Sequence, residues 1–410
     1  MTKNYVNTYL EKTYLTLTQN INLVRAIYLW ILPYILAIYT ISLFTTIHPI
    51  IKDCIFIIIL FFIFLELNST YKIRGQKYLL FLFVSLLVIF PSALYNYTID
   101  NYLILFYRKF QYFTMAFIPV FFMYKINIFR YWRIYTISLF LFFIFTMFFM
   151  HPDIIFKTKD IFLSRNSIAT LALFCFLVLY KSIRNKLIFI LFAIPLFYFM
   201  LKSGSKTAVY SIALLIFLHI AHRTIFNATL RNKIIYLFVF IVGFYYLYYE
   251  LLFFSDITRL IENEVITSSN QRIVEMIIGL NVWYDNFIIG VGNSNFVLMI
   301  HNLFEQYAYM LFPNVPWYHL SGYDSTSQNV LIDLVAIYCL YSIAYILFLI
   351  YLLIIAFRSA GSLFFKYLLF IPVVILLVNS FSLGNGFEFI FYLFISFSLS
   401  INMRKNISNG

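Results

Sequence analysis

The sequence has little charge and few of the residues that build common soluble sites. Charged residues make up 11% of the 410 residues, and there are 3 Cys, 11 Gly and 9 Pro. Each cysteine, at Cys54, Cys175 and Cys339, stands alone in an apolar run, which argues against a disulfide framework and a metal site. The P-loop, His-Glu-x-x-His and Gly-x-Ser-x-Gly motifs are also absent. Nucleotide hydrolysis, zinc proteolysis and serine hydrolase chemistry therefore have no support.

Apolar residues dominate instead. The chain is 63% hydrophobic, with 51 Phe and 35 Tyr, and its mean hydropathy is +0.90. Repeated apolar runs of roughly 17–25 residues are typical of transmembrane helices. In lipid, backbone groups must be satisfied within helices or a closed barrel, and these runs show no strand alternation. We therefore expect an all-α, polytopic integral membrane protein, with residues 1–410 forming a single membrane domain.

Hydropathy predicts about twelve spans. They fall near residues 26–46, 52–67, 78–94, 106–124, 134–150, 168–181, 187–201, 207–222, 233–252, 329–357, 367–380 and 387–402. The polar start over residues 1–25 is too long for a cleavable signal, so the first span is expected to be a retained anchor.

Lysine and arginine set the expected orientation. The basic loops near 72–77, 125–133, 181–186 and 223–233 fall on one side of a twelve-span chain, together with both termini. The positive-inside rule makes that side the cytoplasm. This bias explains the net charge of +13 better than a nucleic-acid partner does.

One long polar segment, 253–328, interrupts the apolar runs between the ninth and tenth spans and is expected to face outward. Apolar residues at helical spacing predict a helix over 271–284 and a second over 296–311. Gly290-Val291-Gly292 between them predicts a tight turn. Residues 312–328 carry two prolines and a glycine, which favours an irregular lid. The pairs Arg272–Glu275 and His301–Glu305 can equally be solvated helical ion pairs.

Basic residues on the outer side oppose the topological bias. Lys52, Lys157 and Lys159 are readily explained by snorkelling to lipid headgroups, and Arg108 and Lys109 begin the expected fourth span. The local sequence around four others favours a site: Arg165, Lys206, Arg259 and Arg272.

The order of four short motifs resembles the O-antigen polymerase and ligase superfamily. The motifs are Ser164-Arg165-Asn166-Ser167, Ser203-Gly204-Ser205-Lys206-Thr207, the block from Arg272 through Trp283 to Gly290-Val291-Gly292-Asn293, and Ser327-Gln328-Asn329. Together they cover roughly residues 160–350. Two positions depart from the family pattern. Lys206 stands where the family commonly has Arg, which loses the bidentate fork. Gln328 stands where it commonly has His, and glutamine cannot act as a general base.

The resemblance implies a glycosyltransferase that joins undecaprenyl-pyrophosphate-linked oligosaccharide repeat units at the periplasmic face of the bacterial inner membrane. It needs no nucleotide or metal, because the lipid-linked donor is already activated. Arg165, Lys206, Arg259 and Arg272 are expected to bind pyrophosphate, and Arg272, His319 and Asp324 to act in catalysis, with Glu305 and Asp333 as other possible bases. The expected glycan contacts are Trp283, Trp317, Tyr323, Gln328 and Asn329.

Two alternatives remain. One is a ligase of the same superfamily that transfers finished polymer to lipid A-core, against which the missing His-Asn pair counts modestly. The other is a flippase or transporter of the lipid-linked unit. Transporters place ionisable residues near the midplane, whereas Arg108, Lys109 and Glu388 are expected near span ends. A chain-length regulator and a flippase of the same pathway are implied as partners, with the lipid bilayer.

Overall fold

A computed structural model describes most of the apolar chain. It covers residues 27–45, 49–67, 76–96, 99–123, 125–149, 165–183, 185–202, 211, 268–311, 330–378 and 386–408. Throughout these ranges the chain is helical, apart from short turns. The all-α prediction is therefore confirmed for the described residues. The expected spans 207–222 and 233–252 lie outside them, except for Ser211.

The helices follow the apolar runs. Within the described ranges, four are long and apolar enough to cross a membrane: Ile27–Phe44, Lys77–Tyr95, Ile128–Thr146 and Leu331–Ser359. The helices after the first are α2 (Pro49–Leu67), α3 (Gln76–Tyr95), α4 (Ile99–Phe121), α5 (Ile128–Phe149), α7 (Arg165–Ser182), α8 (Lys186–Lys202), α12 (Ser268–Asp285), α13 (Asn293–Leu311), α14 (Val330–Tyr338), the 3₁₀ turn η3 (Cys339–Ser342), α15 (Ile343–Ser359), α16 (Leu363–Leu368), α17 (Phe370–Val378) and α18 (Phe387–Ser408).

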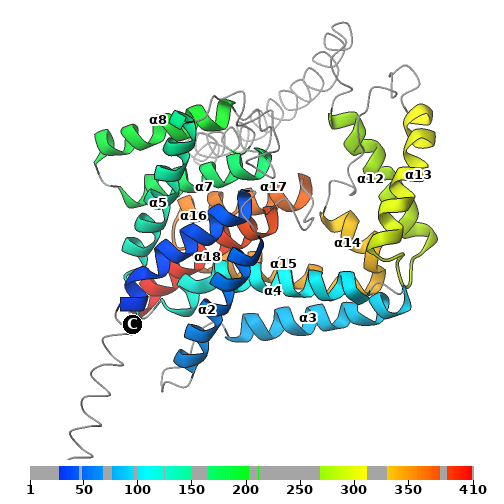
Figure 1. Cartoon of the computed structure of the whole chain (residues 1–410), viewed down its shortest axis with the longest axis horizontal. Coiled ribbons are helices and arrows are strands. Elements are labelled where there is room, and N and C mark those ends of the chain that lie inside the picture. The colour runs from blue at the N-terminus through cyan, green and yellow to red at the C-terminus, as the bar shows by residue number, and fades with distance from the viewer. Residues whose placement is uncertain are drawn as a thin grey trace, which may run out of the picture.

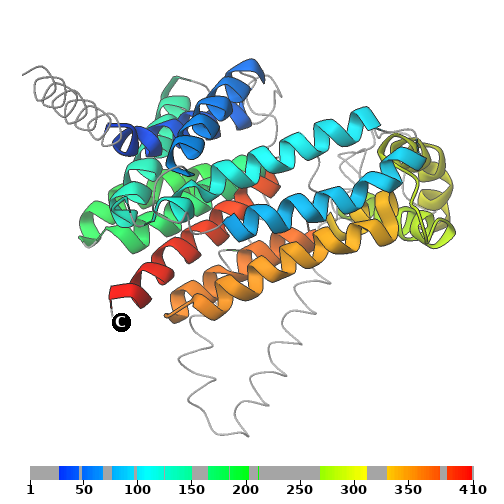
Figure 2. The ribbon, with the colours of Figure 1, turned by 90° about the horizontal axis from the view of Figure 1, so that it is seen from below.

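The last helix, α18, is the centre of the bundle. Every described side chain from Phe387 to Asn402 is buried, and α18 contacts α4, α5, α7, α15 and α17. Its apolar residues occur on all sides rather than on one stripe, which is typical of a helix enclosed by others. Figures 1 and 2 show it between these helices.

Small polar side chains fix the contacts of α18. The indole Nε1 of Trp132, on α5, donates to Ser400 Oγ at 2.9 Å. The amide of Asn402 donates to Ser398 O at 2.8 Å and accepts from the Gly361 backbone at 3.3 Å. Serine lets neighbouring helices approach closely, and side-chain hydrogen bonds add to van der Waals packing between membrane helices.

Three helices run parallel through this core. Lys109 and Phe113 of α4 lie beside Glu388 and Tyr392 of α18, and Phe348 of α15 also packs on Phe113. In contrast α3 is antiparallel to α4, since the Tyr102 hydroxyl reaches back to Leu86 O at 2.8 Å.

The bundle has one extended end. In Figures 1 and 2, α3, α4 and α14 continue past the start of α18, and α12 and α13 lie across their tips. We refer to this as the α12–α13 end. Because η3 separates α14 from α15, with Cys339 at a positive φ of 48°, the 29-residue span Leu331–Ser359 is interrupted near this end.

Candidate functional site

The two helices predicted in the polar segment are present as α12 and α13. Helix α12 ends at Asp285, as expected, and α13 begins at Asn293, three residues before the predicted start. Gly290 and Gly292 have φ values of 79° and 74°, the left-handed region that glycine enters without steric cost. The predicted tight turn is confirmed.

This turn joins the polar segment to the membrane bundle. Val291 N donates to Ala336 O at 3.3 Å, and Gly292 N donates to Ile337 O at 3.0 Å. On the other side, the turn accepts one hydrogen bond from α3 and one from the residue that follows this helix. Ser92 Oγ donates to Ile289 O at 2.6 Å, and Asn96 Nδ2 donates to Gly290 O at 3.3 Å. The glycines therefore attach α12 and α13 to both α3 and α14.

Gly290→Ala tests this attachment. A Cβ at Gly290 would lie 2.4 Å from the carbonyl oxygen of Ile337, in a backbone conformation that alanine rarely adopts. We expect the free energy of unfolding to fall by about 2 kcal/mol or more. Thermal unfolding of the purified protein in detergent measures the loss. Gly361→Ala is the matched control, because its Cβ would meet only Asn402 Oδ1 at 3.8 Å. Equal midpoints for the two variants would contradict the close approach.

The structure places three of the predicted site residues. Arg272 is the fifth residue of α12 and Arg165 the first of α7, and neither side chain is among those described. Trp283 is partly buried, with its ring 5.9 Å from that of Phe287. Since packing already uses part of Trp283, the neighbouring Tyr284, which is 80% exposed, offers the larger free ring. The other predicted residues lie outside the described ranges: Lys206, Arg259, Trp317, His319, Tyr323, Asp324, Gln328 and Asn329.

The described acidic residues of the polar segment and of α14 differ in exposure. Glu275, on α12, is fully buried. The interpretation of Arg272 and Glu275 as a solvated surface pair is therefore wrong, because Glu275 is not at the surface. His301 and Glu305 are both exposed, one turn apart on α13. Asp333, in the first turn of α14, is 7% exposed. A buried carboxylate in a helix bundle needs compensating charge or hydrogen bonds.

A buried charge cluster that the sequence did not predict lies inside the bundle. Lys109 Nζ of α4 contacts Glu388 Oε2 of α18 at 2.8 Å, with side-chain exposures of 3% and 4%. Tyr345 donates to Glu388 Oε1, and Tyr392 donates to the same atom at 3.1 Å. Lys109 Nζ also lies 4.7 Å from the centre of the Tyr345 ring. We call these four residues the buried charge cluster.

Its position corrects one prediction. The fourth span was expected to begin at residue 106, which placed Lys109 near its end. In fact α4 begins at Ile99, so Lys109 is the eleventh of its 23 residues. The polar residues at 108, 109 and 111 lowered the hydropathy of a continuous helix, because a hydropathy window cannot show that they pair with one another or with other helices.

A second, more accessible pair adjoins this cluster. Arg108 Nη1 contacts Asp53 Oδ1 of α2 at 2.8 Å, with side-chain exposures of 21% and 33%. The same nitrogen donates to Gln111 Oε1 at 2.8 Å, and Gln111 Nε2 donates to Asp53 Oδ1 at 3.2 Å. Arg108 and Lys109 therefore point to different partners, one toward the surface at α2 and one toward the core at α18.

The glycine turn and the buried charge cluster are connected through successive helical elements. Tyr345 on α15 follows Ile337 on α14 by eight residues, with η3 between them. Lys109 follows the start of α4 by ten residues, about 15 Å. Because α4 has 23 residues, this distance places Lys109 near the middle of the helix.

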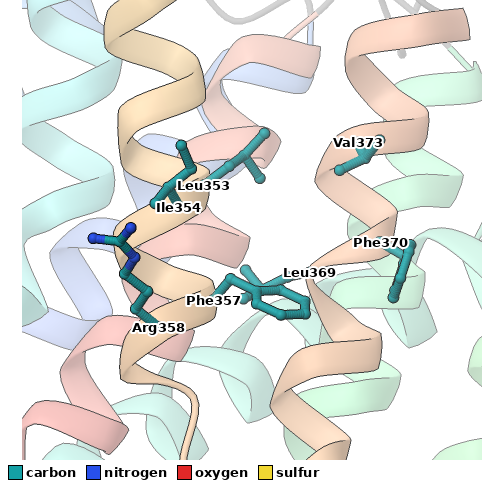
Figure 3. Close-up of a pocket in the computed structure, with 7 residues that line it drawn as sticks. All are labelled: Leu353, Ile354, Phe357, Arg358, Leu369, Phe370 and Val373. Carbon is teal, nitrogen blue, oxygen red and sulfur yellow. The ribbon is translucent and has the colours of Figure 1, made fainter.

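Two surface grooves among the described residues are largely apolar. One, of about 310 Å³, lies between α15 and the α16–α17 region and is lined mostly by Leu, Ile, Val and Phe. Figure 3 shows Arg358, its one charged lining residue, pointing away from the other labelled side chains. The other groove, of about 260 Å³, lies between α3 and α15. Arg358 in the first groove and Ser85 and Tyr351 in the second are the polar residues of these linings, so neither groove gathers several polar groups as a sugar or phosphate site would. Among the described residues, no group of three or more His, Cys, Asp or Glu could hold a metal ion.

Comparisons with known proteins found no matching family model and no similar curated protein.

Proposed function

We propose that the chain is a polymerase that joins undecaprenyl-pyrophosphate-linked oligosaccharide repeat units into O-antigen or capsular polysaccharide. The observation that carries this proposal is the attachment of α12 to the bundle. The Arg272-to-Gly-Val-Gly block, the strongest part of the family resemblance, forms one helix and one turn held by α3 and α14. Such an attachment supports a fixed position for Arg272 relative to the membrane helices.

In this reaction the acceptor hydroxyl attacks the anomeric carbon of the donor glycan. A new C–O bond forms, the bond from the anomeric carbon to the pyrophosphate oxygen breaks, and the pyrophosphate leaves on its lipid. A base takes the hydroxyl proton, for which His319 and Asp324 are our candidates. Negative charge develops on the leaving group, and arginine stabilises it through charge-assisted hydrogen bonds. Arg165, Lys206, Arg259 and Arg272 are the proposed donors.

The proposed topology has twelve spans, cytoplasmic termini and residues 253–328 as a periplasmic loop in the inner membrane. Helix direction supports it. In a twelve-span chain the fourth, tenth and twelfth spans run the same way, and α4, α15 and α18 are parallel in the bundle. The third span runs the opposite way, as α3 does relative to α4.

Gene deletion followed by electrophoresis of the surface polysaccharide tests the function. A single repeat unit on lipid A-core, with no ladder, is expected for a polymerase. Finished polymer left on its lipid carrier would indicate the ligase instead. An unchanged ladder would reject the whole superfamily.

One observation favours a transporter of the lipid-linked unit as a second candidate. The Lys109–Glu388 pair lies at the middle of α4 rather than at its end, and buried charges inside a bundle often mark ion-coupled transport. Spheroplasts of the deletion strain separate the two. Repeat units accessible at the outer leaflet support the polymerase, whereas units trapped on the inner leaflet support the transporter.

A further inference from the structure

In the part of the chain that the structure describes, the guanidinium of Arg108 makes hydrogen bonds through Nη1. Nη1 makes both of its hydrogen bonds, to Asp53 and Gln111. No described residue accepts a hydrogen bond from Nε or Nη2, which together form the other bidentate edge of the fork. Gln111 is buried, so Nη1 is held from the protein side. The orientation of the second edge is thereby fixed in advance.

A second cation belongs to the same cluster of charges. Lys52, in the first turn of α2, is half-buried, and its charge interacts with those of Arg108 and Asp53. Its carbonyl oxygen accepts a hydrogen bond from Gln111 Nε2 at 3.4 Å, which ties this turn of α2 to α4. The cluster therefore contains two cations, Lys52 and Arg108, and one carboxylate, Asp53. The 21% exposure of the Arg108 side chain makes the place accessible from outside.

The surface next to this charge is apolar and exposed. Ile57 and Phe61 follow Asp53 at intervals of four residues on one face of α2, with exposures of 62% and 59%. In a membrane protein such a face contacts lipid chains. A charged group at the head of an apolar stripe matches the shape of a lipid, with an anionic headgroup above its chains.

We propose that the Nε–Nη2 edge of Arg108, together with Lys52, binds the phosphate group of a lipid whose chains lie along α2. If the chain is a polymerase, it must hold two lipid-linked molecules at once, one as donor and one as acceptor. This site then holds the phosphate of the second molecule, apart from the site assigned to Arg272. That assignment rests on the proposed function, whereas phosphate-lipid binding itself does not.

Native mass spectrometry of the purified full-length protein tests the binding. The probes are undecaprenyl pyrophosphate, phosphatidic acid, phosphatidylcholine and inorganic pyrophosphate. We expect one tightly bound phosphate lipid, with phosphatidylcholine and inorganic pyrophosphate bound more weakly. Arg108→Gln should weaken phosphate-lipid binding roughly tenfold, as expected for the loss of charge-assisted hydrogen bonds. Arg108→Lys should recover part of it, because the charge remains without the fork.

Lys52→Gln provides an independent variant, since it leaves the Asp53–Arg108 pair in place. It should weaken binding severalfold even if Arg108→Gln fails to fold. The matched control is Lys186→Gln, an exposed lysine at the start of α8, which should bind as the unaltered protein does. Equal lipid binding by the Lys52→Gln and Lys186→Gln variants would overturn the site. Tighter binding of inorganic pyrophosphate than of undecaprenyl pyrophosphate and phosphatidic acid would overturn the lipid as its ligand. If the deletion strain shows that the chain is not a polymerase, these binding results still stand, because they are measured on the purified protein.

Discussion

Replacing Lys109 by methionine is expected to lower the free energy of unfolding by about 3–5 kcal/mol. The substitution leaves the Glu388 carboxylate, only 4% exposed, without the ammonium that lies 2.8 Å from it. The hydroxyls of Tyr345 and Tyr392 still donate to the carboxylate, but a hydrogen bond does not neutralise a buried charge. Thermal unfolding in detergent should show a clear fall in the midpoint.

The double variant Lys109→Met with Glu388→Gln should recover most of this loss. Removing both charges also removes the cost of burying them, and a glutamine carbonyl still accepts from the two tyrosines. The control is Lys186→Met, which removes an exposed lysine at the start of α8. It should change the free energy of unfolding by no more than about 0.5 kcal/mol. A double variant no more stable than Lys109→Met would show that the two charges do not compensate each other.

The same double variant distinguishes the two candidate functions. If the Lys109–Glu388 pair only holds α4 to α18, a folded double variant should restore the polysaccharide ladder to the deletion strain. If the pair carries a proton during transport, the folded variant should fail, because neither methionine nor glutamine exchanges protons. The ladder therefore reports on function separately from stability.

Local sequence predicted the helices well because their apolar periodicity is local. The residues Ile273, Met276, Ile277, Leu280 and Trp283 predicted α12, and its observed bounds are Ser268–Asp285. The two glycines predicted a turn, and both have positive φ. What periodicity could not show is that this turn lies against the backbone of Ile337, since that contact joins distant parts of the chain.

The buried charge cluster escaped prediction for the same reason. Lys109 and Glu388 are 279 positions apart, and without the fold each reads as an isolated charge near the edge of an apolar run. One signal was available. The last helix carries apolar residues on every side, which indicates enclosure, and a glutamate in an enclosed helix requires a cation from a neighbour. That reasoning would have selected a basic residue in another span, although not Lys109 in particular.

Arg272→Ala is expected to reduce polymer formation by roughly 10²–10³-fold, the usual cost of removing one donor that stabilises a developing negative charge. In our proposal Arg272 acts on the pyrophosphate as it leaves, so the loss should appear in the rate of chain extension. The measurement is the ladder restored to the deletion strain by the variant, at protein levels matched by immunoblot. Arg272→Lys should retain part of the activity, because it keeps the charge but not the bidentate fork.

The position of Arg272 makes this test specific. It is the fifth residue of α12. The far end of this helix is held by the glycine turn, which accepts hydrogen bonds from Ser92 and Asn96 and donates two to α14. Gln306→Ala, on the exposed face of α13, alters the same unit without touching the proposed chemistry and should keep a full ladder. If Arg272→Ala folds, is present at normal levels and still gives a full ladder, Arg272 has no catalytic role. The pyrophosphate would then have to be held by other cations, with Arg165 and Lys206 the next to replace.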